Sequence, residues 1–171
     1  GQGADGWGDW RFHRSRIRAQ PCDVIENIVD IAHFPHVHGG EVRAFENRFG
    51  ERTVTQVSRV QQTAAARSVI PPGLPFDMEA MRAQSVDNPS DAWGDATYHG
   101  PSIMYYYTES RGGAVDYRSW WVNYHTPVNS EEVDLCSAVI VSGLEGEPVP
   151  EEFAEQYAIG AHAAFGQDVE I

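Results

Sequence analysis

The alternation of apolar and polar residues predicts that most of the chain forms β-strands. Residues 10–19 (WRFHRSRIRA) alternate with a period of two, and residues 51–60 (ERTVTQVSRV) are rich in β-branched side chains. Three further strands are predicted over 97–109, 115–127 and 131–141. Five positions of the last strand share one face, and these are Val133, Leu135, Ser137, Val139 and Val141.

Two other segments have the spacing of a helix. Apolar residues recur at helical spacing from Pro21 until Pro35, which interrupts a regular helix. A last helix is predicted near Pro150, because PEEF places a proline and two carboxylates in a first turn. Roughly between 61 and 96, Pro and Gly clusters predict a loop, either a lid or a plain surface excursion. The strands outnumber the helices without βαβ alternation, so we expect an α+β fold with a curved antiparallel sheet wrapped on the C-terminal helix.

Composition adds that the chain is a packed domain with an acidic surface. Its 171 residues are 42% hydrophobic and include five Trp, seven Tyr and seven Phe. The net charge is -13, which argues against nucleic acid as a partner. No apolar run is long enough to span a membrane, and the two cysteines lack a metal-binding spacing, so we expect a cytoplasmic protein. The chain starts without Met and stops within a helical pattern, which indicates a piece of a longer polypeptide.

The segment ENIVDIAHFPHVHGG (26–40) concentrates groups that bind metals. Because Pro35 lies between His33 and His38, the two cannot share one regular helix, but a turn after the helix can bring them together. On the last helix, Asp168 projects to the same inward face as Tyr157, whereas His162 projects away from it. A buried carboxylate needs a cation or a hydrogen-bond donor.

Two histidines and one carboxylate from separate elements form the ligand set of a non-heme Fe(II) site, which leaves adjacent positions open for dioxygen and substrate. Asp30 precedes His33 by three residues and is placed to hold its ring. Two other readings stay open for this segment. His36 is a spare ligand or a solvated turn residue, and a zinc hydrolase would use the same ligands with Glu26 as base.

The metal-binding segment and the C-terminal segment both resemble motifs of a known family. The motif formed by Asn27, Asp30, His33 and His38 resembles the iron-binding motif of the Rieske non-heme iron oxygenases. The C-terminal FGQDVEI resembles the segment that supplies the third iron ligand, here Asp168. The stretches YHGPSIMYYY and NYHTPVNSEEVDLCSAVIVSGL resemble the 3-ketosteroid 9α-hydroxylase oxygenase components.

The resemblance implies a helix-grip (START-like) catalytic domain over 1–171, with mononuclear Fe(II) held by His33, His38 and Asp168. Electrons then come from NAD(P)H through a ferredoxin or flavin reductase to a Rieske [2Fe-2S] cluster. In a homotrimer they cross to the iron of the neighbouring subunit through Asp30, and Asn27 lies near the iron without ligating it. The chain has no Cys-x-His and Cys-x-x-His pair, so the cluster is expected in the full-length protein and not in this chain.

The expected reaction is hydroxylation of a hydrophobic polycyclic substrate by O2, with a steroid as the substrate that the resemblance implies. Tyr105, Tyr107 and Trp120 are the candidates for lining a substrate cavity under the sheet, although cross-strand packing is the more common role of such rings. The alternatives are aromatic-ring hydroxylation, O-demethylation, and a helix-grip protein that binds a hydrophobic ligand without redox chemistry.

Overall fold

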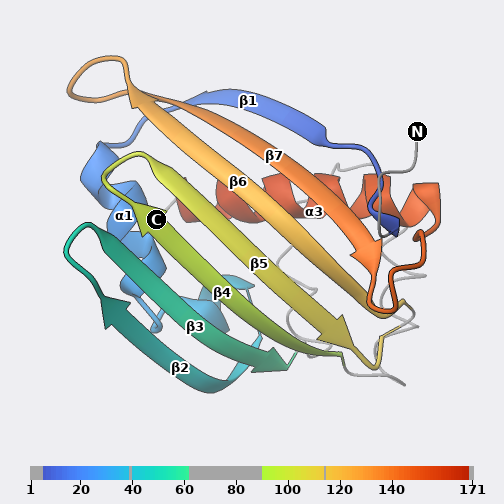
Figure 1. Ribbon diagram of the computed structural model, residues 1–171. Helices are drawn as coiled ribbons and strands as arrows, with labels where there is room; N and C mark the ends of the chain where they lie inside the picture. Colours follow the sequence, from blue (N-terminus) through green and yellow to red (C-terminus); the bar gives the residue numbers. More distant parts are fainter. Residues whose placement is uncertain (1–5, 39, 62–89, 114, 170–171) are drawn as a thin grey trace.

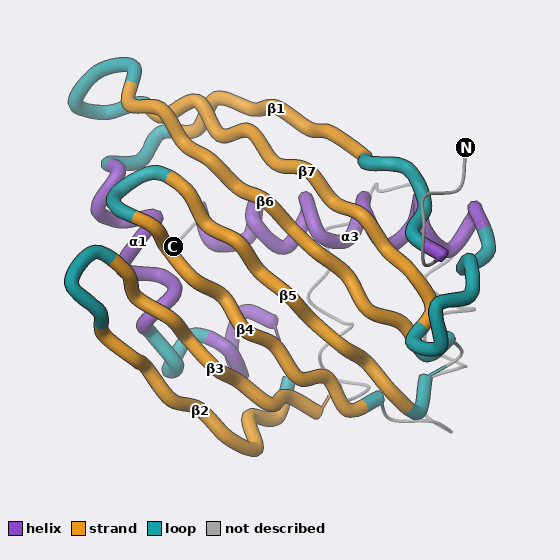
Figure 2. The backbone as a smooth tube through the Cα atoms, in the orientation of Figure 1, coloured by secondary structure: helices purple, strands orange, loops and turns teal. Residues whose placement is uncertain are grey.

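A computed structural model describes residues 6–38, 40–61, 90–113 and 115–169, except for the side chains of 21, 28, 37, 38 and 163–169. In this part of the chain, seven strands form one antiparallel sheet in the order β1-β7-β6-β5-β4-β3-β2. Figures 1 and 2 show the sheet as one curved layer with α3 crossing behind it. The expected α+β arrangement of a sheet wrapped on a C-terminal helix is therefore confirmed.

Four strands lie where the alternation predicts them. They are β1 (Arg11–Ile17), β3 (Thr53–Gln61), β6 (Tyr117–Pro127) and β7 (Val133–Gly143). The predicted inward face of β7 is confirmed, since Val133, Val139 and Val141 are each at most 1% exposed. Burial of these branched side chains ties the sheet to the helices, at about 1.5–3 kcal/mol for each fully buried residue.

The other three strands differ from the prediction. β2 (Glu41–Phe49) was not predicted, because a register shift between Val42 and Ala44 breaks its period of two. β4 (Asp91–His99) occupies the end of the predicted loop, where pairing with β3 and β5 outweighs the low strand propensity of Gly and Asp. The single strand predicted over 97–109 is wrong, because the chain turns at Gly100, whose φ is 60°, before β5 (Ile103–Arg111). Residues 62–89 of the predicted loop lie outside the described residues.

The first helix is shorter than predicted. α1 (Pro21–Val29) ends at Asp30, and a separate π-helical turn, η2 (Phe34–His38), follows. Pro35 is the second residue of η2, where a helix needs no backbone N–H. The predicted continuation of one helix to Pro35 is therefore wrong, while α3 (Glu151–Val169) begins one residue after Pro150 as expected.

The sheet has an inner face, covered by α1 and α3, and an outer face. On the inner face, Ala96, Tyr98 and Met104 pack against Ile25 and Val29 of α1. A second cluster joins β7 to α3 through Val139, Ala158 and Ala161, with Trp121 and Tyr157 packed against it. No helix in the described part of the chain is both long enough and apolar enough to cross a membrane.

Tyr157 fixes α3 to the sheet by polar contacts as well. Its hydroxyl accepts a hydrogen bond from Trp121 Nε1 at 3.0 Å and shares another with Ser119 Oγ at 2.7 Å. Burial holds the pKa of Tyr157 well above its ordinary value, so the hydroxyl stays protonated. The helix that carries Asp168 is thus held at a defined rotation against β6.

Candidate metal centre

The turn between α1 and η2 brings Asp30 and His33 together. Asp30 leaves the helical conformation, with φ −85° and ψ 108°, and its Oδ1 accepts a hydrogen bond from the backbone N–H of Ala32 at 2.8 Å. This bond holds the carboxyl group so that Oδ2 lies 3.4 Å from Nδ1 of His33. With Nδ1 turned to a carboxylate, Nε2 is the ring nitrogen left to bind a metal.

His33 is screened from water, whereas Asp30 reaches it. The side chain of His33 is 8% exposed and that of Asp30 is 53% exposed. The pair therefore joins a buried imidazole to a carboxylate at the protein surface. The carboxylate of Glu26, which lies on α1, is exposed and outside this pair.

The other two predicted ligands lie on elements that meet. His38 ends η2, Asp168 is in the last turn of α3, and η2 contacts α3. The C-terminal end of α3 lies on the α1 side of the sheet (Figure 1). The side chains of His38 and Asp168 lie outside the described residues, and the described side chains contain no group of three His, Cys, Asp or Glu that could hold a metal. A three-ligand site therefore remains a prediction.

The remaining residues of the motif differ in exposure. Asn27 is half-buried on α1, near the turn that carries Asp30 and His33. His36 is exposed, and its backbone N–H bonds to the carbonyl oxygen of His33 at 2.9 Å. This exposure fits the reading of His36 as a solvated turn residue.

Buried polar side chains on the inner face were missed by the sequence reasoning. Asn123 of β6 is 0% exposed, and neither atom of its amide has a hydrogen-bond partner among the described residues. Nε2 of Gln56, which is 4% exposed, is in the same situation. A buried amide without a partner costs about 1–3 kcal/mol, so these groups indicate that the inner face receives polar atoms of water or a ligand. The available signal was their position, since both alternate with outward residues on strands with buried faces.

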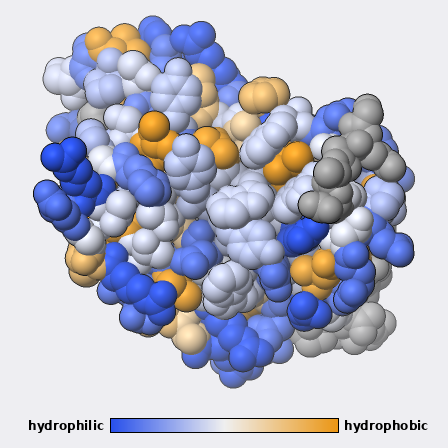
Figure 3. All heavy atoms as spheres, in the orientation of Figure 1, coloured by the Kyte–Doolittle hydropathy of each residue, from blue (hydrophilic) through white to orange (hydrophobic). Residues whose placement is uncertain are grey.

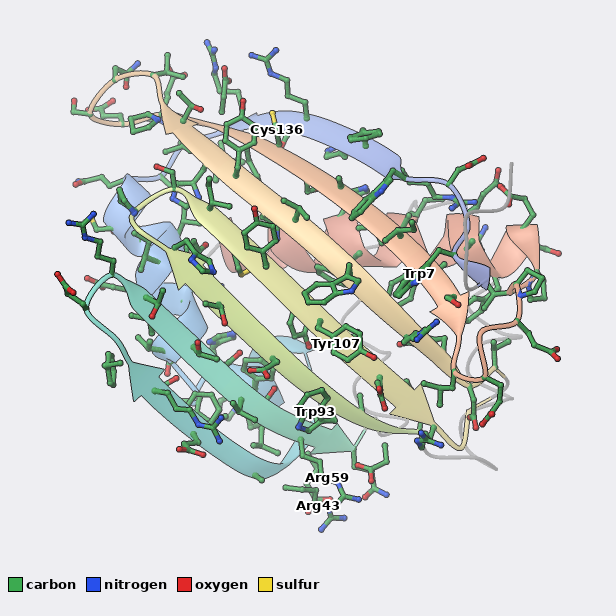
Figure 4. All side chains as sticks on the ribbon, in the orientation of Figure 1. Trp7, Arg43, Arg59, Trp93, Tyr107 and Cys136 are labelled. Carbon is green, nitrogen blue, oxygen red and sulfur yellow. The ribbon has the colours of Figure 1, made fainter. Side chains whose placement is uncertain are left out.

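The aromatic residues proposed for the substrate lie on the other side of the sheet. Tyr106 and Trp121 point to the inner face, where their rings meet at 5.4 Å, so their neighbours in sequence point outward. Tyr105 and Trp120 are 42% and 39% exposed, and Tyr107 lies beside Trp120 on the same outer face. Figure 4 shows Tyr107 on the face turned to the viewer, with α3 behind the sheet. The expectation of a cavity under the sheet lined by these three residues does not agree with this arrangement.

The predicted orientation of His162 is also wrong. Its Nδ1 lies 2.7 Å from Ser137 Oγ on β7, and its ring stacks on His13 of β1 at 4.6 Å. Burial, with a smaller contribution from His13, lowers the pKa of His162 to about 4, so the ring is neutral at pH 7. The inward face of α3 is therefore wider than the projection from Phe153 suggested, and the position of Asp168 on that projection carries less weight.

Comparison with known proteins identifies the family. A family model described as "3-Ketosteroid 9alpha-hydroxylase C-terminal domain" matches residues 1–171. The chain belongs to this family. The 3-ketosteroid 9α-hydroxylase resemblance of the sequence is thereby confirmed.

Curated relatives of this chain match almost its whole length. The oxygenase component of a 3-ketosteroid-9-alpha-monooxygenase from Rhodococcus rhodochrous is 33% identical over 174 residues, covering 100% of this chain and 41% of the relative. The protein of the same name from Mycobacterium tuberculosis (strain ATCC 25618 / H37Rv) is 28% identical over 177 residues, covering 98% of this chain and 41% of that relative. The chain thus spans less than half the length of the curated relatives it matches.

Solved structures confirm the helix-grip fold of this family member. Dicamba monooxygenase bound to 3,6-dichlorosalicylic acid has a TM-score of 0.62 at 15% identity, covering 93% of this chain and 46% of that one. A START superfamily protein from Mycobacterium smegmatis has a TM-score of 0.57 at 11% identity, covering 95% of both chains. At these identities the similarity shows the fold alone.

Proposed function

We propose that this chain is the catalytic domain of an iron-dependent monooxygenase that hydroxylates a hydrophobic polycyclic substrate of the 3-ketosteroid class. The observation that carries the proposal is the contact of Asp30 with His33 beside the meeting of η2 and α3, in a chain of the 3-ketosteroid 9α-hydroxylase family. The same motif in a ligand carrier would have no need for a buried imidazole oriented by a carboxylate.

The residues present fit a ferrous ion. His33 offers Nε2 from a buried position, and His38 and Asp168 come from two elements in contact. In this proposal these three side chains hold the iron, and two neutral imidazoles with one carboxylate leave the site with a net positive charge. When bound, the iron supplies the dioxygen chemistry that inserts an oxygen atom into a C–H bond.

The other residues of the motif, Asp30 and Asn27, orient the ligands and connect the metal site to a redox partner. Oδ2 of Asp30 lies 3.4 Å from Nδ1 of His33, a contact that favours the tautomer with the proton on Nδ1 and directs Nε2 to the metal. Because its carboxylate is half exposed, Asp30 also offers a contact to a neighbouring redox centre at the surface. Asn27 lies near the metal without ligating it.

The substrate binds on the inner face of the sheet in this proposal. The rings of Tyr106 and Trp121 supply apolar surface there, and the amide of Asn123 supplies a buried hydrogen-bond donor. A donor without a protein partner suits a ketone oxygen of the substrate. Tyr105, Tyr107 and Trp120 have no part in this substrate site, because they face away from α3.

The rest of the active protein lies outside this chain. We infer that a longer polypeptide carries a Rieske [2Fe-2S] cluster, which receives electrons from a ferredoxin or flavin reductase. Transfer between subunits of a homotrimer would bring the cluster of one subunit to Asp30 of the next. Two free cysteines, Cys22 and Cys136, agree with a location in the reducing cytoplasm.

Anaerobic reconstitution with Fe(II) tests the metal proposal directly. We expect the chain to retain one iron ion after desalting and to give a high-spin iron-nitrosyl EPR signal with nitric oxide, because an open coordination position is required. The His33→Ala variant should lose both the iron and the signal. A folded chain that retains no iron would favour the hydrophobic-ligand carrier, and one that retains zinc in preference would favour the hydrolase.

Substitution of Asn123 tests the substrate class. In Asn123→Leu we expect the affinity for a 3-ketosteroid to fall roughly 5-fold, the equivalent of a hydrogen bond of about 1 kcal/mol. The affinity for the same steroid without the ketone should be unchanged or higher, since the apolar side chain removes a buried amide. Isothermal titration of both steroids with both proteins measures this difference, and an equal loss for the two steroids would contradict the hydrogen bond.

A further inference from the structure

The outer face of the sheet contains a depression that the proposed oxygenase chemistry does not use. It is open to solvent, has a volume of about 410 Å³ and is lined by Asp95, Thr97, His99, Tyr105, Tyr107 and Trp120. This volume suits a small molecule. Because these side chains point away from α1 and α3, the depression is separated by the sheet from the proposed iron and steroid site.

The depression forms where short side chains are paired with large aromatic ones across neighbouring strands. Asp95 pairs with Tyr107 and Thr97 pairs with Tyr105 across β4 and β5, so short side chains lie beside tall rings. Trp120 of β6 pairs with Tyr107 and extends the wall, with ring centroids 4.9 Å apart. Trp93 meets Tyr107 edge to face at 5.9 Å, and Figure 4 shows both on the viewer's side of the sheet.

A carboxylate lies at the foot of these rings. Oδ1 of Asp95 is buried and has no hydrogen-bond partner among the described residues. The charge of Asp95 acts on Arg48, but the guanidinium of Arg48 donates two hydrogen bonds to Glu46, at 2.9 and 3.0 Å. Among the described residues Asp95 therefore has no ion pair, and a cation bound in the depression can lie beside its carboxylate.

The rings themselves are suited to a cation. The hydroxyl of Tyr107 donates to Glu109 Oε1 at 2.7 Å, which increases the electron density of the ring. Burial and the Glu109 carboxylate raise the pKa of Tyr107 to about 12, so this donor is retained at neutral pH. The faces of Tyr and Trp attract cations, and a group of such rings is the usual receptor for quaternary ammonium compounds. Figure 3 shows this face with pale spheres, the shade of intermediate hydropathy, around its centre and blue spheres at its margins.

We propose that this depression is a binding site for a small quaternary ammonium compound, with Tyr105, Tyr107 and Trp120 around its methyl groups and Asp95 as counter-ion. The acidic chain, with a net charge of -13, favours the approach of such a cation. A steroid fits poorly here, because a neutral polycycle would leave the Asp95 carboxylate without a partner. The site is independent of iron binding, so its failure would leave the oxygenase proposal untouched.

Titration of the chain with choline tests the site, using calorimetry and the fluorescence of tryptophan. We expect saturable binding with a Kd on the order of 1 mM, as two or three exposed rings and one carboxylate allow. The neutral analogue 3,3-dimethylbutan-1-ol has the same shape and should bind at least roughly 10-fold more weakly. Methylguanidinium represents an arginine side chain of a protein partner, and it should also bind more weakly than choline.

Two variants and two matched controls locate the binding. Asp95→Asn keeps the side-chain shape, and Trp120→Leu removes one ring, and each should weaken choline binding roughly 5- to 10-fold. Glu41→Gln and Tyr124→Leu change an exposed acid of β2 and an exposed ring of the outer face, both outside the depression, and should bind as the parent does. The proposal is overturned by the absence of saturable binding, by equal binding of the neutral analogue, by tighter binding of methylguanidinium, or by unchanged binding in Asp95→Asn.

Discussion

Replacing Asp168 by alanine is expected to abolish iron retention while the sheet and helices remain as in the parent chain. In the proposed site Asp168 is the sole carboxylate ligand, and two imidazoles alone leave the ferrous ion without its charge partner. Iron per chain is counted after anaerobic loading and desalting, and circular dichroism reports the fold. We expect retention to fall from one iron per chain to a background level.

Glu155 provides a matched control on the same helix. Its side chain is exposed, so Glu155→Ala removes an equal charge from α3 without touching the proposed site. This variant should retain iron as the parent does. Normal iron retention in Asp168→Ala, or equal loss in both variants, would contradict the assignment of Asp168 as a ligand.

The second large effect is expected for Asp30→Asn, in a polypeptide that also carries the Rieske cluster. The variant should keep its iron, because Asp30 holds His33 and does not bind the metal in this proposal. Its turnover should fall roughly 10- to 100-fold, the usual consequence of removing the carboxylate that orients a metal-binding histidine. Stopped-flow oxidation of the reduced cluster measures the step that we expect to slow.

The neighbouring acid Glu26 supplies the comparison for Asp30. It lies one turn earlier on α1 and is exposed, so Glu26→Gln should leave both iron content and electron delivery unchanged. A zinc hydrolase with Glu26 as base would give the opposite order of effects. Full-rate cluster oxidation in Asp30→Asn would remove its bridging role.

Sequence reasoning succeeded where one periodicity decides the structure. The alternating residues of β7 and the first turn of α3 could be predicted because burial on one face imposes a fixed spacing. It failed where tertiary pairing overrides local pattern, as in the shifted register of β2 at Val42. The helix ended at Asp30 rather than Pro35 because the aspartate side chain captures the backbone N–H of Ala32, a competition that periodicity does not register.

At the candidate site, too, local spacing was predictable from the sequence and tertiary arrangement was not. The spacing of Asp30 and His33 predicted their proximity, since a short turn brings residues three apart together. The spacing could not give the face on which the aromatic pairs lie, because that depends on the pairing of β5 with β6 and on the position of α3. Tyr105 and Tyr107 lie on the outer face and Tyr106 on the inner face, because on a strand one residue reverses the face.

The position of β1 has a consequence for the order in which the protein folds. β2 to β7 are neighbours in sequence order, but β1 pairs with β7, so that Arg11 lies opposite Val139 at the far edge from β2. During synthesis β1 emerges first and has to wait for the last strand before it can pair. The segment with Asp30 and His33 connects β1 to β2 and thus spans two opposite edges of the sheet. Its β2 end is fixed when β2 pairs with β3, but its β1 end is fixed only when β7 has formed, so metal binding should be among the last events of folding.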